Sequence, residues 1–441
     1  MNPAQIRLWS VLFCMAALAA LSQPVLANTL CVNPGGTGGC YATIQAAVTA
    51  ASPNDVINVA AGTYNEQVTI GKSLSLIGAG YSSSIINATN FPNGVLLDGL
   101  NNPGLHDVTV AGFTVEDALY EGVLVLNTTG AVIRDNHIIN NDKEGPNSTG
   151  TACVGQPSYE TDEGGDCGGG LHLMGAVNTL VSNNTVTGNA DGILITDETA
   201  ESHNNVIVKN GVSNNARECG IVLASHPPVG STPPKYAAHH GVDSNTIWNN
   251  VSNKNGLSGG GAGVGLFSDG EGPGKVTSNS IVGNTLTNNS LPGVALHSHN
   301  GPARGAPADN MYGNMIIANT INGNGSDVAD SATPGTAGIN ISSGDGGSGV
   351  QGTVITLNVI SNEKVALAVN TTSELAAHFN SFLGGDIGVA NDCTLDGAAC
   401  TGSIDATDNY WGCSTGPGTS GCSTVSGSKI LSTPWLSSTP N

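Results

Sequence analysis

A short phrase built on asparagine repeats along most of the chain, and it limits the possible folds more than any other feature. In each copy an Asn is followed two residues later by Val, Ile or Leu. The copies start at Asn136, Asn184, Asn210, Asn249, Asn284, Asn319 and Asn358. Further Asn residues follow soon after, as at Asn189 and at Asn288-Asn289. Similarity repeated in a fixed order predicts a stack of structural repeats.

A Gly and a short apolar segment with alternating pattern follow the first six copies of the phrase. These segments are GLHLM (170–174), GILIT (192–196), GIVLA (220–224), GVGLF (263–267), GVALH (293–297) and GINIS (338–342). Alternation with a period of two predicts strands, and no long run with the helical period of 3.6 interrupts them. We therefore expect an all-β coil of short parallel strands. Asn suits its turns because it tolerates the left-handed conformation, and stacked Asn side chains can hydrogen-bond to one another.

The first 27 residues have the features of a secretory signal peptide. Arg7 precedes an apolar core, and Val25-Leu26-Ala27 fits a cleavage site after Ala27. No later run is long and apolar enough to predict a membrane span. We expect a secreted, periplasmic or cell-surface protein, and the sequence does not decide among these three locations.

The cysteines fit an oxidising compartment. Four pairs close short loops, and we expect the disulfides Cys31–Cys40, Cys153–Cys167, Cys393–Cys400 and Cys413–Cys422, although the sequence does not fix their connectivity. Cys219 is left over beside the Gly220 strand. We interpret it as a packed thiol rather than a reactive one.

The charge of the chain limits its partners. Lys and Arg number 12 against 33 Asp and Glu, which gives a net charge of −21. This balance argues against nucleic acid and anionic membranes as partners. It also disfavours a polyanionic sugar unless a cation bridges the two.

The two ends of the chain differ from its middle. Residues 41–51 form an amphipathic helical pattern in which Ile44, Ala47, Val48 and Ala51 share a face, and a helix here would close the open end of a strand stack. Residues 55–80 predict three strands, and regular coils extend to about Val369. Residues 393–441 hold two Cys pairs, DNYWG (408–412) and PWL (434–436), which we interpret as a C-terminal cap. The mature chain is expected to be one elongated domain.

Three features together resemble secreted bacterial right-handed parallel β-helix proteins of the pectin-lyase-like superfamily. They are the stretch from Thr43 to Gly80, the Asn/Gly repeats, and the DNYWG…GP…PW ending. The resemblance implies a right-handed solenoid of roughly nine to eleven coils, with the β-helix and its N-terminal cap over 28–392 and a disulfide-rich cap over 393–441. It is specific for fold and weak for function, because the superfamily includes lyases, hydrolases, esterases, epimerases and adhesins.

Polar side chains recur just past the ends of the Gly-led strands. Inside, the alternation predicts a core of aliphatic pairs: Leu171/Leu173, Ile193/Ile195, Ile221/Leu223, Val264/Leu266, Val294/Leu296 and Ile339/Ile341. Two residues beyond the last outward position come Glu198, His226, Asp269 and His299 in successive coils, which would stack about 4.8 Å apart. Arg304 lies in a neighbouring loop. Carboxylates and imidazoles in this arrangement favour acid–base chemistry, and the alternatives are a divalent metal site or a solvated edge.

Other side chains complete the predicted site. His172, Phe267 and His297 point outward from the strands, and with Tyr236 they are candidate contacts for sugar rings. Glu160, Asp162, Glu163 and Asp166 lie within one predicted disulfide loop and could hold Ca²⁺, or else form a solvated acidic loop.

These features predict a protein that binds an extended polysaccharide along the Gly-strand sheet and could cleave it by lyase or hydrolase chemistry at Glu198, His226, Asp269, His299 and Arg304. The alternative is a non-catalytic, adhesin-like binding protein, and a third possibility is a metal-handling β-helix protein, disfavoured by few Met and free Cys. We expect a monomer. No cofactor other than Ca²⁺ is indicated.

Overall fold

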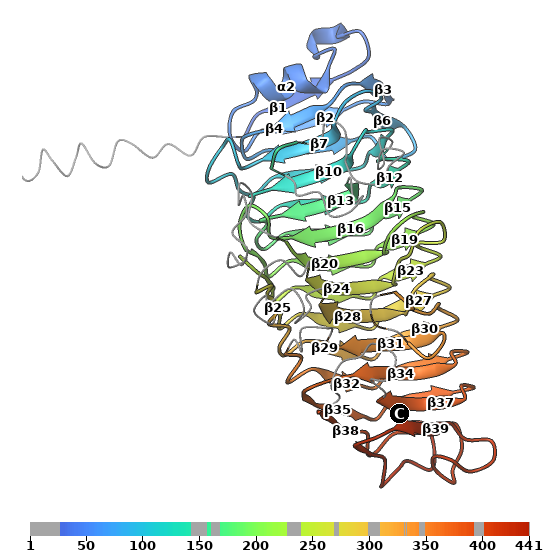
Figure 1. Cartoon of the computed structure of the whole chain (residues 1–441). Coiled ribbons are helices and arrows are strands. Elements are labelled where there is room, and N and C mark those ends of the chain that lie inside the picture. The colour runs from blue at the N-terminus through green and yellow to red at the C-terminus, as the bar shows by residue number, and fades with distance from the viewer. Residues whose placement is uncertain are drawn as a thin grey trace, which may run out of the picture.

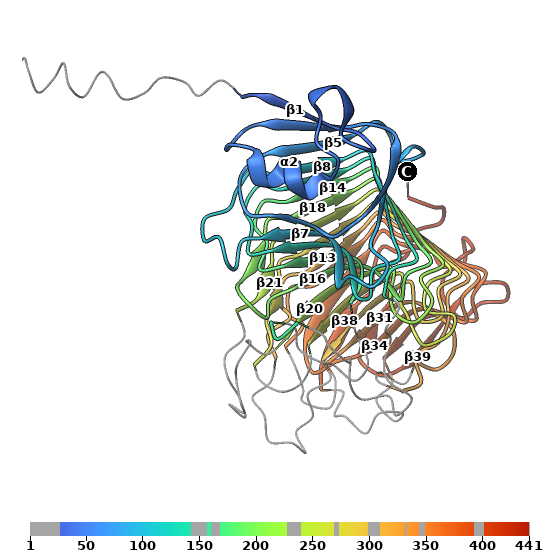
Figure 2. The same ribbon diagram turned by 90° about the horizontal axis from the view of Figure 1, so that it is seen from above.

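The computed structural model describes most of the chain. The described residues are 27–142, 157–159, 168–226, 240–268, 273–298, 309–329, 331, 333–343, 349–391 and 401–440. The predicted signal peptide therefore lies outside them, apart from Ala27. Figure 1 shows short strands stacked along one axis, and Figure 2, seen from above, shows that α2 lies at the N-terminal end of this stack.

Three long sheets run the length of the stack, and all their strands pair in parallel. Within the described residues the longest sheet has 14 strands. Its strands are β1 (Thr29–Val32), β2 (Val56–Val59), β5 (Ser75–Gly78), β8 (Thr109–Ala111), β11 (Val132–Arg134), β14 (Leu180–Ser182), β18 (Val206–Val208), β22 (Thr246–Trp248), β26 (Ser280–Val282), β29 (Met315–Ile317), β32 (Val354–Thr356), β35 (Glu374–His378), β38 (Ser403–Asp405) and β40 (Ile430–Leu431).

The second sheet contains the Gly-led strands and has 12 members in the described part of the chain. They are β4 (Val68–Ile70), β7 (Asn93–Asp98), β10 (Glu121–Leu126), β13 (Gly169–Met174), β16 (Asp191–Thr196), β20 (Ile221–Ser225), β24 (Val264–Ser268), β28 (Val294–Ser298), β31 (Ala337–Ser342), β34 (Val365–Asn370), β37 (Ile387–Asn391) and β39 (Thr424–Gly427). We call it the Gly-strand sheet.

The third sheet has 11 described strands, which agrees with the predicted nine to eleven coils. They are β3 (Gly62–Asn65), β6 (Ser84–Asn87), β9 (Thr114–Glu116), β12 (His137–Ile139), β15 (Thr185–Thr187), β19 (Gly211–Ser213), β23 (Val251–Asn253), β27 (Thr285–Thr287), β30 (Thr320–Asn322), β33 (Val359–Ser361) and β36 (Ser381–Leu383). A small sheet adds β17 (Ser202–His203), β21 (Val242–Asp243) and β25 (Val276–Thr277).

The core follows the predicted alternation. All the aliphatic pairs predicted to point inward from the Gly-strand sheet are fully buried in one continuous apolar cluster. Two details of the prediction were wrong. Residues 55–80 contain four strands (β2 to β5) rather than three, because the turn at Ala60-Ala61 separates β2 from β3. Regular coils also continue past Val369, since β35, β36 and β37 form a further turn.

Asn side chains form hydrogen-bonded ladders inside the turns, as the repeats predicted. Asn284 is typical. Its Oδ1 accepts from the backbone N–H (2.9 Å) and the Nδ2 (3.1 Å) of Asn250 in the preceding coil. Its own Nδ2 donates to Oδ1 of Asn319 in the next coil (3.0 Å) and to the carbonyl of Ile247 (2.9 Å). The Asn284 amide therefore uses all of its hydrogen-bonding capacity.

Three such ladders run along the stack. The first contains Asn136, Asn184, Asn210, Asn250, Asn284, Asn319, Asn358, Asn380 and Asn409. The second, five residues further along in each coil, contains Asn141, Asn189, Asn215, Asn255, Asn289 and Asn324 and ends at Glu363. The third contains Asn205, Asn245, Asn279 and Asn314.

Asn249 was assigned to the repeat wrongly, because Asn250 occupies the ladder position. Asn249 is the preceding residue and has a left-handed backbone (φ 53°). The strand that follows is shifted in the same way, so Ser252 is buried and Val251 is 48% exposed. A left-handed residue precedes the ladder Asn in other coils too, as at Asn183 and Lys209. The left-handed Asn and the hydrogen-bonding Asn are therefore two different positions.

Where a Gly opens a strand of the Gly-strand sheet, its close neighbours require it, as at Gly170 and Gly192. A Cβ on Gly192 would lie 2.1 Å from the carbonyl oxygen of Gly220 and 2.5 Å from Cγ1 of Val212. A Cβ on Gly170 would lie 2.7 Å from Nδ2 of Asn189, in the second ladder. Any side chain here would push the sheet away from the ladder beside it.

The ends of the stack are covered as predicted at the N-terminal side. Helix α2 (Ile44–Ala50) buries Ile44, Ala47 and Val48 against the first coils, and a short 3-10 helix, η1, spans Thr37–Gly39. Both oxygens of Glu66 accept hydrogen bonds from the first backbone N–H groups of α2. This contact fixes the start of the helix.

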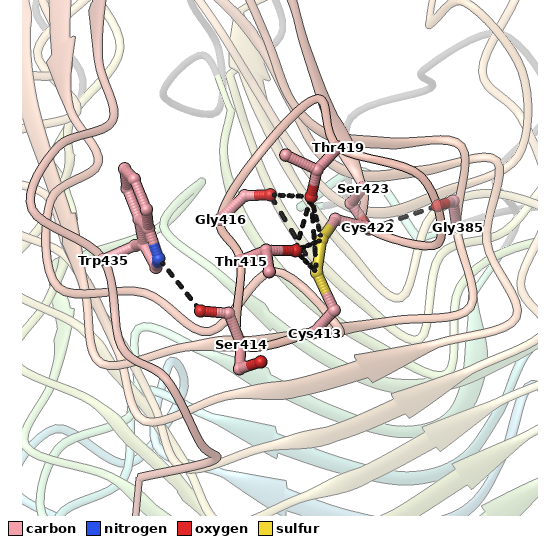
Figure 3. Close-up of a disulfide and its surroundings, with 9 residues drawn as sticks. All are labelled: Gly385, Cys413, Ser414, Thr415, Gly416, Thr419, Cys422, Ser423 and Trp435. Carbon is pink, nitrogen blue, oxygen red and sulfur yellow. Dashed lines mark hydrogen bonds between the residues drawn. A yellow bond between two sulfur atoms is a disulfide. The ribbon is translucent and has the colours of Figure 1, made fainter.

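Two of the four expected disulfides lie in the described residues, and both are formed. Cys31–Cys40 ties β1 to the segment before α2. Cys413–Cys422 lies in the last part of the chain, where Figure 3 shows the Thr415 and Thr419 hydroxyls beside its sulfurs and the Trp435 indole donating to the carbonyl of Ser414. The pairs Cys153–Cys167 and Cys393–Cys400 lie outside the described residues. Cys219 is a buried free thiol whose sulfur accepts from the N–H of Ala262, as its packed interpretation predicted.

Candidate functional site

The outward face of the Gly-strand sheet is largely covered rather than open. Leu96, Leu124, Leu126 and Met174 form one apolar cluster on this face. A second cluster further along contains Leu194, Val222, Ala224 and Ala295, with Phe267 packed against it. Because charged groups are seldom buried without partners, the polar side chains among these apolar neighbours stand out.

A line of buried polar side chains crosses four neighbouring strands on this face. It starts at Glu121 of β10, whose Oε2 accepts from the backbone N–H of Gly169 (2.9 Å). Its Oε1 lies 2.8 Å from Nδ1 of His172 on β13, and Nε2 of His172 lies 2.6 Å from Oγ1 of Thr196 on β16. All three side chains are buried.

The line continues just past the ends of β16 and β20. Oε1 of Glu198 lies 3.1 Å from Nδ1 of His226, and the two side chains are 2% and 5% exposed. The structure thus brings together these two residues of the predicted polar column, and their burial excludes a solvated edge at this point. The second oxygen, Oε2 of Glu198, has no hydrogen-bond partner among the described residues.

Glu198 is held ionised by its neighbours. Burial acts to raise the pKa of its carboxyl, but the charge and hydrogen bond of His226, the charge of His172 and the Thr196 hydroxyl outweigh it and lower the pKa to about 2. A permanently charged carboxylate beside an imidazole favours the protonated ring and fixes its orientation.

Asp197, the residue before Glu198, has the opposite environment. Its carboxylate accepts from the hydroxyl of Ser225, the backbone N–H of His226 and the backbone N–H of Gly241. Burial raises its pKa to about 7, although the bonds from Gly241 and His226 act to lower it. Adjacent residues thus direct two carboxyls into different surroundings, and Asp197 fixes the backbone that carries His226.

Phe267 and His297, two of the predicted substrate contacts, touch each other. They are register partners on β24 and β28, and their ring centroids are 4.7 Å apart. Phe267 is half-buried and His297 is buried. His172 was predicted to contact substrate, but both of its ring nitrogens have partners within the protein.

The remaining predicted site residues lie outside the described part of the chain. They are Asp269, His299, Arg304 and Tyr236, and the acidic group Glu160, Asp162, Glu163 and Asp166. Among the described residues no group of three or more His, Cys, Asp or Glu side chains is arranged to hold a metal ion.

The sequence reasoning missed Glu121, Thr196 and Asp197. Asp197 was passed over because its neighbour Glu198 fitted the column, although an Asp-Glu pair at a strand end is itself a signal. Glu121 is the first residue of β10, directly before its Gly, at the position that Asp191 occupies two strands later. Comparing that outward position between coils would have revealed it.

Comparisons with known proteins agree with the fold. The family described as "Right handed beta helix region" matches residues 81–232. Among solved structures, DFA-IIIase from Arthrobacter chlorophenolicus A6 without its lid superposes with a TM-score of 0.55 and 12% identity, covering 88% of this chain and 93% of that one. The catalytic domain of a GH87 alpha-1,3-glucanase carrying D1069A, in complex with tetrasaccharides, superposes with a TM-score of 0.50 and 14% identity. This match covers 93% of this chain and 69% of that one.

The A-module of mannuronan C-5 epimerase AlgE6 from Azotobacter vinelandii gives a TM-score of 0.47 at 16% identity, covering 89% of this chain and 94% of that chain. No curated protein matches the sequence. The stacked parallel sheets and the family match together show that the chain is a right-handed parallel β-helix protein. None of its described helices has the length and apolarity needed to cross a membrane.

Proposed function

We propose that this protein processes a glycan and that the Glu198–His226 pair is its reaction centre. The observation that carries the proposal is the buried contact between these two side chains, 3.1 Å apart at the edge of the Gly-strand sheet. An imidazole titrates near neutrality and is the most common proton-transfer group in enzymes. A carboxylate hydrogen-bonded to its other nitrogen selects the tautomer and stabilises the protonated form.

In this proposal the three polar groups have separate roles. His226 transfers a proton to or from a substrate oxygen or carbon. Glu198 keeps the ring oriented and charged from its buried position behind His226. Asp197 is a positioning residue, because it binds the backbone N–H of His226 (2.7 Å) and does not face the reacting group directly.

Two further observations support a sugar as the substrate. Phe267 and His297 pack as a ring pair on the next strands of the same sheet, and an aromatic face of this kind is a usual platform for a sugar ring. Two solved structures that superpose with TM-scores of at least 0.50 are a DFA-IIIase and an alpha-1,3-glucanase, the latter with tetrasaccharides bound. This second support is an analogy of fold, so the site must supply the decisive test.

The test is an activity panel on neutral and uronic polysaccharides, with and without Ca²⁺. Ultraviolet absorbance detects the unsaturated products of a lyase, and a reducing-end assay detects hydrolysis. We expect activity on at least one substrate, lowered roughly 100-fold or more in His226→Asn and Glu198→Gln. His378→Asn, a histidine on the 14-stranded sheet, is the control and should keep full activity.

Full activity in His226→Asn would show that the protein is an enzyme but would refute the Glu198–His226 pair as its reaction centre. Binding by calorimetry without any turnover would replace the proposed enzyme with the non-catalytic binding protein that the sequence also allowed. Cation dependence in the same panel tests the expected Ca²⁺.

A further inference from the structure

Three residues at the start of the line of buried polar side chains take no part in the proposed reaction. Glu121, His172 and Thr196 lie on β10, β13 and β16 and precede the Glu198–His226 pair along the line, and all three are buried. Burying a carboxylate and an imidazole in an apolar face costs free energy that simple packing does not require, because Leu or Met fills the same face in neighbouring coils. Packing alone therefore does not explain why these three polar side chains are buried here.

We propose that Glu121, His172 and Thr196 form a hydrogen-bonded relay that sets the protonation state of the Glu198–His226 pair. This inference rests on the proposed function of that pair and adds its control. The links are Glu121 Oε1 to His172 Nδ1 (2.8 Å) and His172 Nε2 to Thr196 Oγ1 (2.6 Å). Thr196 and His172 are both close enough to Glu198 to lower the pKa of its carboxyl.

The hydroxyl of Thr196 is the coupling element, because it carries a single proton. With Nδ1–H of His172 donated to Glu121, a neutral His172 presents a lone pair at Nε2 and takes the Thr196 proton as an acceptor. A doubly protonated His172 donates from Nε2 instead, and the Thr196 hydroxyl is then free to turn its proton toward Glu198. One ring thus decides whether Glu198 gains a hydrogen-bond donor.

The charged groups around the relay set the direction of the effect. Among the described residues these are Glu121 on β10, His172 on β13, Asp191 at the start of β16, and Asp197, Glu198 and His226 beyond β16 and β20. Glu121 favours the proton on His172. A charged His172 in turn opposes a second positive charge on His226, so losing Glu121 should lower the titration midpoint of His172 and raise that of His226.

Nitrogen-15 NMR of histidine rings in the whole protein tests this directly, with His172→Asn and His226→Asn supplying the assignments. In Glu121→Gln, which keeps the side-chain size, we expect the two midpoints to move in opposite directions, each by about half a pH unit or more. The shift of His226 should fall by at least half when Glu121→Gln is placed in a Thr196→Val background. Thr196→Ser, which keeps the hydroxyl, should restore it.

An unchanged His226 midpoint in Glu121→Gln would overturn the relay. So would the same shift in the Thr196→Val background, since the histidines would then interact through space without the hydroxyl. The readout needs no turnover, so its result is separate from that of the substrate panel. A coupled titration in a protein inactive on every glycan would keep the relay and reject the proposed reaction.

Discussion

Glu363 ends the second Asn ladder, and replacing it by Gln should change how stability depends on pH. Its Oε1 accepts from the backbone N–H (2.8 Å) and Nδ2 (3.1 Å) of Asn324, while Oε2 has no partner among the described residues. Burial raises the pKa of this carboxyl from 4.5 to about 7, despite the opposing hydrogen bonds from Asn324. The folded protein therefore binds this proton more tightly than the unfolded chain does.

The sign and size of the effect follow from these two values. The stability that the protonated group contributes is fully present below pH 4.5 and is lost as the pH rises through about 7. Relative to the fully protonated state, linkage gives a loss of folding free energy of about 0.8 kcal/mol at pH 5 and about 3.3 kcal/mol at pH 8. Allowing for solvent screening, we expect a difference of about 2 kcal/mol between the two pH values.

Differential scanning calorimetry of both proteins at pH 5 and pH 8 measures this loss. An unfolding entropy of roughly 2.1 cal/mol/K per residue over the chain converts it to roughly 2 °C in Tm. The Tm of Glu363→Gln relative to wild type should rise by that amount from pH 5 to pH 8. Gln leaves an unpaired donor, but that cost is the same at both pH values. Glu374→Gln, at an exposed position of β35, is the matched control. A Tm difference that does not change with pH would refute the reasoning.

Three further predictions test the packing. Asn250→Ala should lower the free energy of unfolding by about 3 kcal/mol or more in denaturant unfolding, because it removes four buried hydrogen bonds. The neighbouring change Asn249→Gly should cost no more than about 1 kcal/mol. Equal effects of the two changes would contradict the ladder register. Gly192→Ala should lower the free energy of unfolding by about 2 kcal/mol or more, because the new Cβ would clash with its neighbours. Gly211→Ala should be near neutral, because a Cβ there meets nothing within 4 Å. Thermal unfolding of the two variants compares these effects. Cys219 should resist a thiol reagent in the native protein and react after denaturation, because burial raises the pKa of its thiol. Mass spectrometry of labelled peptides detects the difference. Rapid labelling of the native protein would contradict this prediction.

The fold could be predicted from the sequence because its constraints are local and repeated. Alternation fixed which side chains of the Gly-led strands point inward, and the helical pattern around Val48 identified the N-terminal cap. The error at Asn249 has a plain cause: Asn249 is followed two residues later by the apolar Val251, whereas the ladder residue Asn250 is followed by Ser252, a polar residue at the buried position. A one-residue shift moves each side chain of a strand to the other face, so a single buried Ser in this coil was enough to displace the prediction by one residue.

The candidate site was harder to predict for a different reason. The contact between Glu198 and His226 follows from stacking, which the repeats encode. Glu121 and His172 meet because of a diagonal offset across strands, and nothing in the local sequence around either residue signals it. The burial of the outward face was also missed, because an outward position on a strand says nothing about what covers it.

The Asn ladders also have a direction. In every link the Nδ2 group points to the next coil and the Oδ1 atom to the previous one, so the side-chain dipoles add head to tail along the stack. Their positive ends face the C-terminal coils, where Asn409 gives its N–H groups to backbone carbonyls and Asn324 gives its own to the carboxyl of Glu363. An acidic group at the positive end of a row of aligned amides is the arrangement found at the start of an α-helix, produced here by side chains alone. A coil that continued either column would have to offer an acceptor in place of these carbonyls or of the Glu363 carboxyl, because the group presented by each last Asn is a donor.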